Sequence, residues 1–207
     1  MGIRMSTSVF KFDETAYGDT AAKLLLPRRE ADLGPGKPNR DAEQVLRGLT
    51  AKCLFAGRRI ADHGMARACL AGLWLYHDFL DESHAISQEL HTPTGSFWHG
   101  IMQRREEDYE NAKYWFRRVG RHPVFGPLRD AASQAAKEAS NESRLDPQAG
   151  FLATQSEWDP FRFVDLCAAA LKGAGAAKPS LASLCRQVQS REWELLFDHC
   201  YRSAAGD

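Results

Sequence analysis

From Asp41 onward, apolar residues recur every three or four positions along the chain. One such face comprises Ala42, Val45, Leu46, Leu49, Cys53, Ala56 and Ile60, and a second comprises Ala66, Cys69, Leu70, Leu73 and Leu80. This spacing aligns apolar side chains on one face of an α-helix. Strand-like alternation is almost absent after residue 15. The pattern therefore predicts an all-α fold of about seven helices packed as antiparallel hairpins.

Turn formers and capping residues divide this pattern into separate helices. Gly120 is a typical stop after a helix, and Asp159 followed by Pro160 is a typical start. The run HTPTGS at 91–96 and the run GAGAA at 173–177 predict a loop and a linker. Helices are expected at 65–90, 97–106 and 108–119. The first of them has an alternative end near Asp81.

The first 40 residues lack a clear helical period, and turn formers dominate the run GPGKP at 34–38. A length of 207 residues suits one domain with an appended piece. The predicted organisation is an irregular N-terminal arm at 1–40 followed by a single helical domain at 41–207.

Charge and hydropathy narrow the classes of partner. The chain carries 27 Lys plus Arg and 27 Asp plus Glu, so it lacks the basic excess typical of nucleic-acid binders. No apolar run approaches the roughly 20 residues that span a bilayer. No signal peptide pattern opens the sequence. A small molecule or a peptide is thus the expected kind of partner, nucleic acid and membrane are not expected, and the expected location is cytoplasmic. The oligomeric state stays open.

The 5 cysteines show no pairing pattern. Their number is odd and no two of them form a CxxC motif. This usage is typical of reduced thiols in the core of an intracellular protein rather than of a disulfide framework or a zinc finger.

The most unusual stretch of the sequence lies between residues 77 and 122, which holds five of the 7 histidines. On a single helix, His77, Asp81, His84 and Gln88 would share a narrow stripe that continues the apolar face of the preceding turns. Polar groups on a core-facing stripe are costly unless they have partners. Such a cluster in a cleft is a candidate functional site.

Three interpretations of this stripe compete. The first is a satisfied polar network that ties two helices together. The second is a divalent metal as cofactor, zinc, iron or manganese, bound by His77, Asp81 and His84, with or without His99, because imidazole and carboxylate suit these ions. The third is a small-ligand pocket in which a histidine and an aspartate move protons.

The next segment, residues 98–118, mixes arginine pairs with aromatic residues. Guanidinium groups bind phosphate or carboxylate, so Arg104 or Arg105 would neutralise an anionic ligand. Four acidic residues stand beside these arginines, and they favour the alternative of a salt-bridged surface over an aromatic core.

The same segment resembles a tetratricopeptide helix pair. Gly100 matches the glycine of the first helix of that motif, Ala112 and Phe116 match its second helix, and Pro123 lies close to the expected proline. His99 departs from the motif, which has a large aliphatic residue at this position. The resemblance implies an α-hairpin in which small Gly100 and Ala112 let two helices approach closely.

Three runs, HDFLDESHAISQEL, WHGIMQRREEDYENAKYWFRRVGRHP and REWELLFDHCY, are similar to those of an uncharacterised all-helical protein family. This similarity implies no known activity. It implies that the three runs belong to one unit, with the last helix near its centre.

The sequence thus leads to two hypotheses of function. The first is a His/Asp/Arg-lined cleft for a small anionic ligand or a metal, and hydrolytic or proton-transfer chemistry would suit its residue types. The expected ligand-binding residues are His77, Asp81, His84, Gln88, His99, Arg104 and Arg105. The second is a non-catalytic, tetratricopeptide-like protein-interaction module. Whether the chain is an enzyme stays open.

Overall fold

The computed structural model describes residues 10–142, 145–172 and 179–207, and every regular element in these ranges is a helix. The all-α prediction is confirmed. The elements are η1 (Glu14–Tyr17), α1 (Gly18–Leu25), α2 (Arg40–Gly48), α3 (Ala51–Leu54), α4 (His63–Tyr76), α5 (Leu80–Ser87), α6 (Pro93–Arg105), α7 (Tyr109–Val119), α8 (Phe125–Asn141), η2 (Pro147–Ala149), α9 (Gly150–Thr154), α10 (Pro160–Lys172) and α11 (Pro179–Ala205).

The N-terminal segment that was expected to be irregular is partly helical. Asp13 begins η1, and its side chain accepts a hydrogen bond of 3.0 Å from the backbone N–H of Thr15. Helix α1 follows directly, and Leu24 and Leu25 at its end are buried. The expectation of an irregular segment is therefore wrong for residues 14–25. The linker predicted at 173–177 lies outside the described residues.

Capping explains where the helices begin. Helix α6 starts at Pro93 rather than at Phe97, because Thr92 accepts a hydrogen bond of 3.0 Å from the N–H of Gly95. The predicted start of α10 is confirmed, since Asp159 accepts hydrogen bonds from two backbone N–H groups of the first turn. The predicted end of α7 at Val119, before Gly120, is confirmed as well.

A single helix through residues 65–90 is not observed, because the chain turns after Tyr76. Asp78 has a left-handed φ of 64°. Its N–H donates to the carbonyl of Leu75, and the N–H of Phe79 donates to the carbonyl of Trp74. These two bonds form a Schellman motif, in which an aspartate takes the position that glycine usually occupies. Of the two predictions, the break near Asp81 is therefore the closer one. The observed break lies three residues before it, at Asp78.

The hairpin of α6 and α7 shows the predicted close approach. Ala112 is fully buried. A Cβ atom added to Gly100 would lie 3.0 Å from the ring of Phe116. Larger side chains at these two positions would push the helices apart.

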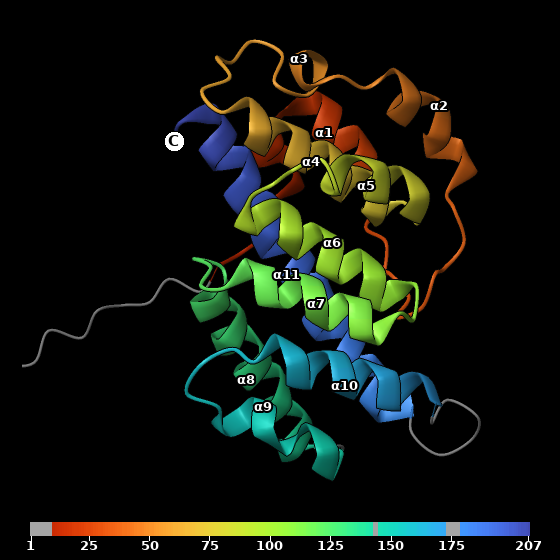
Figure 1. Ribbon diagram of the computed structural model, residues 1–207, viewed down its shortest axis with the longest axis vertical. Helices are drawn as coiled ribbons and strands as arrows, with labels where there is room; N and C mark the ends of the chain where they lie inside the picture. Colours follow the sequence, from red (N-terminus) through yellow and green to blue (C-terminus); the bar gives the residue numbers. More distant parts are fainter. Residues whose placement is uncertain (1–9, 143–144, 173–178) are drawn as a thin grey trace, which may run out of the picture.

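Helix α11 is the element around which the others are arranged. In Figure 1, α1 to α5 lie at one end of the molecule, α8 to α10 at the other, and α6 and α7 between them, with α11 running behind this middle pair. Helix α11 packs against α4, α8 and α10. The last helix is therefore central, as the similarity to the uncharacterised family implies.

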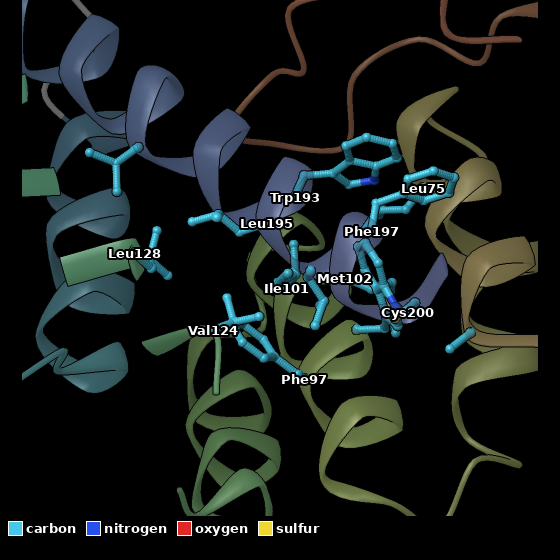
Figure 2. Packing of buried hydrophobic residues seen from close by; sticks show 14 of the residues in the cluster. Leu75, Phe97, Ile101, Met102, Val124, Leu128, Trp193, Leu195, Phe197 and Cys200 are labelled. Atoms are coloured by element: carbon cyan, nitrogen blue, oxygen red, sulfur yellow. The ribbon is translucent and has the colours of Figure 1, made fainter. Parts of the chain in front are cut away.

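The core follows from this arrangement. Figure 2 shows Trp193, Leu195, Phe197 and Cys200 of α11 among side chains from α4, α6 and the start of α8. Phe197 and Cys200 are fully buried. Among the described helices, none combines the length and the apolar character needed to cross a bilayer.

Candidate functional site

The polar stripe predicted from the sequence is divided by the turn after α4. His77 is buried in that turn, and its Nδ1 lies 3.0 Å from the side-chain nitrogen of Asn39. The backbone N–H of Asn39 also donates to the carbonyl of His77 at 2.9 Å. His77 thus fastens the segment before α2 to the end of α4. Asp81 and Gln88 are exposed.

His84 and His99 are the two predicted residues that the structure brings together. Their ring centroids are 4.5 Å apart, and His99 stacks on Trp115 at 3.8 Å. The Nε2 of His99 lies 3.3 Å from the amide nitrogen of Gln103, so Nε2 is the acceptor. Burial, with a smaller contribution from His84, lowers the pKa of His99 to about 4. His99 is therefore a neutral ring between α5 and α7.

The predicted metal site is not assembled. Within the described ranges, no three His, Cys, Asp or Glu side chains are placed to hold a metal ion. His77, Asp81 and His84 were expected to share one helical face, and the Schellman turn at Asp78 removes that face. The metal interpretation is therefore corrected for these three residues.

Arg104 and Arg105 point into the protein and have internal partners. Arg104 is fully buried, where it forms an ion pair with Glu192, hydrogen-bonds to Gln189 at 3.2 Å and lies over the ring of Phe163. Arg105 pairs with Asp78 at 2.6 Å. Its guanidinium also donates to backbone carbonyls, including that of Leu75, and thereby joins the end of α6 to the end of α4. The anions that these arginines neutralise belong to the protein itself.

A roomy hollow lies elsewhere, between the end of α7, the start of α8 and the start of α10. We call it the α7–α10 groove. Its volume is about 660 Å³, within the usual range of small-ligand sites. A second hollow of about 480 Å³ continues it along residues 155–162. The groove is lined by Phe116, Arg117, Gly120, Arg121, His122, Phe125, Gly126, Arg129, Glu157, Trp158, Pro160 and Phe161.

The back of the groove is fixed by two local features. Gly120 ends α7 with φ 61° and ψ −126°, a conformation that a residue with a side chain rarely adopts. His122 then accepts a hydrogen bond from the N–H of Val124 at its Nδ1, so its Nε2–H donates to Thr94 at 3.2 Å. Burial, with a smaller effect of His199, lowers the pKa of His122 to about 4. His122 is thus a neutral, fully engaged ring that ties the α7–α8 corner to α6.

The groove carries an excess of positive charge. Three arginines and one glutamate are among its lining residues. In the part of the chain that the structure describes, Arg117 and Arg121 have no ion-pair partner. Arg129 pairs with Asp130 at 2.6 Å and donates to the carbonyl of Ser156 at 2.7 Å. The two unpaired guanidiniums make the groove attractive to an anion.

Several buried polar atoms in the loop between α9 and α10 have no hydrogen-bond partner. They are both side-chain amide atoms of Gln155 and the indole N–H of Trp158. Leaving a buried polar group unsatisfied costs about 1–3 kcal/mol. Trp158 lines both hollows and Gln155 lines the second. Buried groups of this kind need a partner from outside the protein, such as ordered water, an ion or a ligand, or they mark local strain.

The chain was compared with protein-family models, with curated proteins and with solved structures. None of the three comparisons gives a match. The chemistry of the α7–α10 groove is therefore argued from its own residues.

The groove is not predictable from the sequence for a physical reason. Gly120 and Asp159 are recognisable helix boundaries, but they are far apart in the chain, and no local pattern places them side by side. The alternative of a salt-bridged surface for residues 98–118 did not distinguish Arg117 from Arg118. Arg118 does lie over the rings of Tyr114 and Trp115, whereas Arg117 lines the groove.

Proposed function

We propose that this protein binds a small anionic ligand with a planar or apolar body in the α7–α10 groove. The observation that carries the proposal is the presence of two unpaired guanidiniums, Arg117 and Arg121, at the wall of a hollow of about 660 Å³. A phosphate or carboxylate group of the ligand would lie between these two side chains, where each can donate two hydrogen bonds.

The remaining walls suit the body of such a ligand. Phe125 and Phe161 are half-buried, and Trp158 and Pro160 are buried beside them. Rings of this kind bind planar or hydrocarbon groups by stacking and by excluding water. At the start of α8 the backbone N–H groups of Val124 and Phe125 donate to His122, so the attraction for an anionic group comes from the two arginines.

Binding is proposed rather than catalysis because the imidazole in the groove is already occupied. Both ring nitrogens of His122 have hydrogen-bond partners. A general base needs a free nitrogen within reach of the substrate.

Phenyl phosphate is a suitable probe, because it joins one phosphate to one planar ring. We expect calorimetric titration to detect its binding, with weaker binding of inorganic phosphate and of phenol. Arg117→Gln and Arg121→Gln should each weaken the binding of phenyl phosphate by about tenfold or more, since a hydrogen bond to a charged group contributes about 1.5–3 kcal/mol.

Arg118→Gln is the matched control, because Arg118 lies at the end of the same helix and does not line the groove. It should leave the affinity for phenyl phosphate unchanged. Equal loss in all three variants, or no heat of binding for phenyl phosphate at millimolar concentration, would contradict the proposal.

A second candidate function, a peptide-binding interaction module, is favoured by one observation. The side-chain amide of Gln155, a residue that lines the second hollow, has a donor and an acceptor that are buried without a partner. These are the two groups that pair with the backbone of an extended peptide. Fluorescence anisotropy with a labelled acidic peptide tests this candidate function. The candidate requires that Gln155→Ala weaken the binding of the peptide and leave the binding of phenyl phosphate unchanged.

A further inference from the structure

Helix α7 turns one side away from the rest of the described chain. Its main packing partners are α6 and α10, and in Figure 1 it lies in front of α11. Tyr114, in the middle of α7, is 45% exposed, and it is one of three large hydrophobic residues that are exposed among the described residues. Tyrosine is enriched where proteins bind one another, so this side of α7 is a candidate contact surface.

Three exposed residues follow one another along this side at intervals of four positions. They are Glu110, Tyr114 and Arg118, and we call them the α7 row. Residues four positions apart lie on neighbouring turns of the same helix face. The row is therefore about 12 Å long. One end of it is negative, the other end is positive, and Tyr114 marks the middle.

The two charges of the row are only weakly engaged within the protein. The side chain of Glu110 is 88% exposed and lies 3.6 Å from Lys113, which pairs more closely with Asp165 at 2.6 Å. Within the residues that the structure describes, Arg118 has no ion-pair partner. Its guanidinium lies over the ring of Tyr114 at 5.9 Å and makes a long contact of 3.5 Å with the hydroxyl of this tyrosine. Both charges can therefore accept a partner from another molecule.

The same order of charge extends beyond the row to both ends of α7. The exposed charged residues are Glu107, Asp108 and Glu110 at the beginning and Arg117, Arg118 and Arg121 at the end. A second α7 that ran parallel to the first would place like charges together. A second α7 that ran antiparallel would place carboxylates against guanidiniums at both ends. This charge complementarity selects a second copy of the chain, in the antiparallel orientation, as the partner of the face.

We propose that the protein forms a two-fold symmetric dimer through the outer face of α7, with the two helices antiparallel. Tyr114 of one protomer would meet Tyr114 of the other at the axis, and Glu110 of each would pair with Arg118 of the other. A two-fold axis makes this ion pair twice. One helix face is small beside the roughly 1,600 Å² of a standard interface, so the dimer is weak and reversible.

This dimer is independent of the proposed ligand site. Arg118 does not line the α7–α10 groove, and neither do Glu110 and Tyr114. Binding of phenyl phosphate and self-association can therefore be measured separately, and failure of one leaves the other standing.

Sedimentation velocity of the full chain, from micromolar to millimolar concentration, tests the proposal. We expect a monomer at the lowest concentration and a growing fraction of dimer at low ionic strength. The dimer should dissociate in about 1 M salt, where charges are screened within about 3 Å. A monomer at all concentrations, or a dimer that persists unchanged in this salt, overturns the proposal.

Charge reversal identifies the face and the orientation. Glu110→Arg gives a row with arginine at both ends, and Arg118→Glu gives a row with glutamate at both ends. Each variant alone should dimerise at least about tenfold more weakly than the original chain, because like charges would meet. An equimolar mixture of the two should form a heterodimer, because each ion pair is then restored in the antiparallel arrangement.

Glu138→Arg is the matched control, because Glu138 is an exposed glutamate on α8, outside the α7 row. It should dimerise like the original chain. Thermal unfolding of each variant verifies that the fold is retained. If the folded Glu110→Arg and Arg118→Glu variants dimerise as the original chain does, or if their mixture stays monomeric, the proposal is overturned.

Discussion

Gly95 lies directly against the backbone of Leu90, so closely that a Cβ atom on Gly95 would overlap the Leu90 carbonyl oxygen. The N–H of Gly95 also donates to Thr92, the residue that caps α6. The start of α6 therefore has room only for glycine at this position, and α6 in turn carries Trp98, His99 and Arg104 into the core.

The first prediction follows from this contact. Gly95→Ala should destabilise the protein by about 3 kcal/mol or more, because the added methyl group must displace backbone rather than a side chain. Gly126→Ala is the control, since Gly126 also lies in the first turn of a helix and a Cβ there meets nothing within 4 Å. Urea unfolding measures both, and a similar change in the two variants would contradict the explanation.

The second prediction concerns pH. The pKa values of His77, His99 and His122 are each lowered to about 4, mainly by burial. In the unfolded chain these histidines titrate near 6.5. Between these two values the unfolded state binds more protons, so stability is complete above about pH 6.5 and declines as the pH falls towards 4.

We expect a loss of about 1 kcal/mol per histidine between pH 7.5 and pH 5.5, measured by urea unfolding at the two values. His99→Gln should remove about a third of this loss, because glutamine does not titrate. A free energy of unfolding that is the same at both pH values would refute the assignment of neutral, buried rings.

The third prediction concerns the ion pair of Arg104 and Glu192, whose side chains are both fully buried. Glu192→Gln should destabilise the protein by about 3–5 kcal/mol, because it leaves the Arg104 charge without its partner in the core. The double variant Arg104→Met with Glu192→Leu should be considerably more stable than Glu192→Gln. Glu43→Gln is the control, because Glu43 pairs with the exposed side chains of Arg40 and Arg47, and its effect should stay within about 1 kcal/mol.

The fourth prediction concerns the thiols. Cys53 is exposed, and hydrogen bonds from Thr50 lower the pKa of its thiol. The other cysteines are buried. Burial and the neighbouring Cys200 raise the pKa of Cys69, and the neighbouring Cys167 together with burial raises the pKa of Cys185. Iodoacetamide should therefore modify Cys53 alone in the native protein and all 5 cysteines in urea. Mass spectrometry of the peptides distinguishes this result from uniform labelling.

The sequence predicted those parts of the fold that depend on neighbouring residues. The apolar spacing indicates helices, and Gly120 and Asp159 mark helix boundaries that the structure confirms. The end of α4 at Tyr76 was not predicted, because the residue that adopts the left-handed conformation is Asp78 rather than a glycine. One local deviation of this kind was enough to divide the predicted stripe of His77, Asp81, His84 and Gln88.

The candidate site was less predictable because its residues meet only through tertiary packing. Arg104 was expected to bind a ligand, because its actual partner, Glu192, lies 88 residues further along the chain and is not recognisable from the sequence around Arg104. Arg117 and Trp158 face one hollow only because α7 packs against α10. A single sequence carries no signal for either contact.

The central place of α11 has a consequence for biosynthesis. The ribosome makes α4, α8 and α10 before the helix that covers them, so the nascent chain emerges with the apolar faces of these three helices open to water. Until α11 is added, these three faces lack the helix that covers them, and the burial of Phe197 has to follow the synthesis of helices that precede it by many residues.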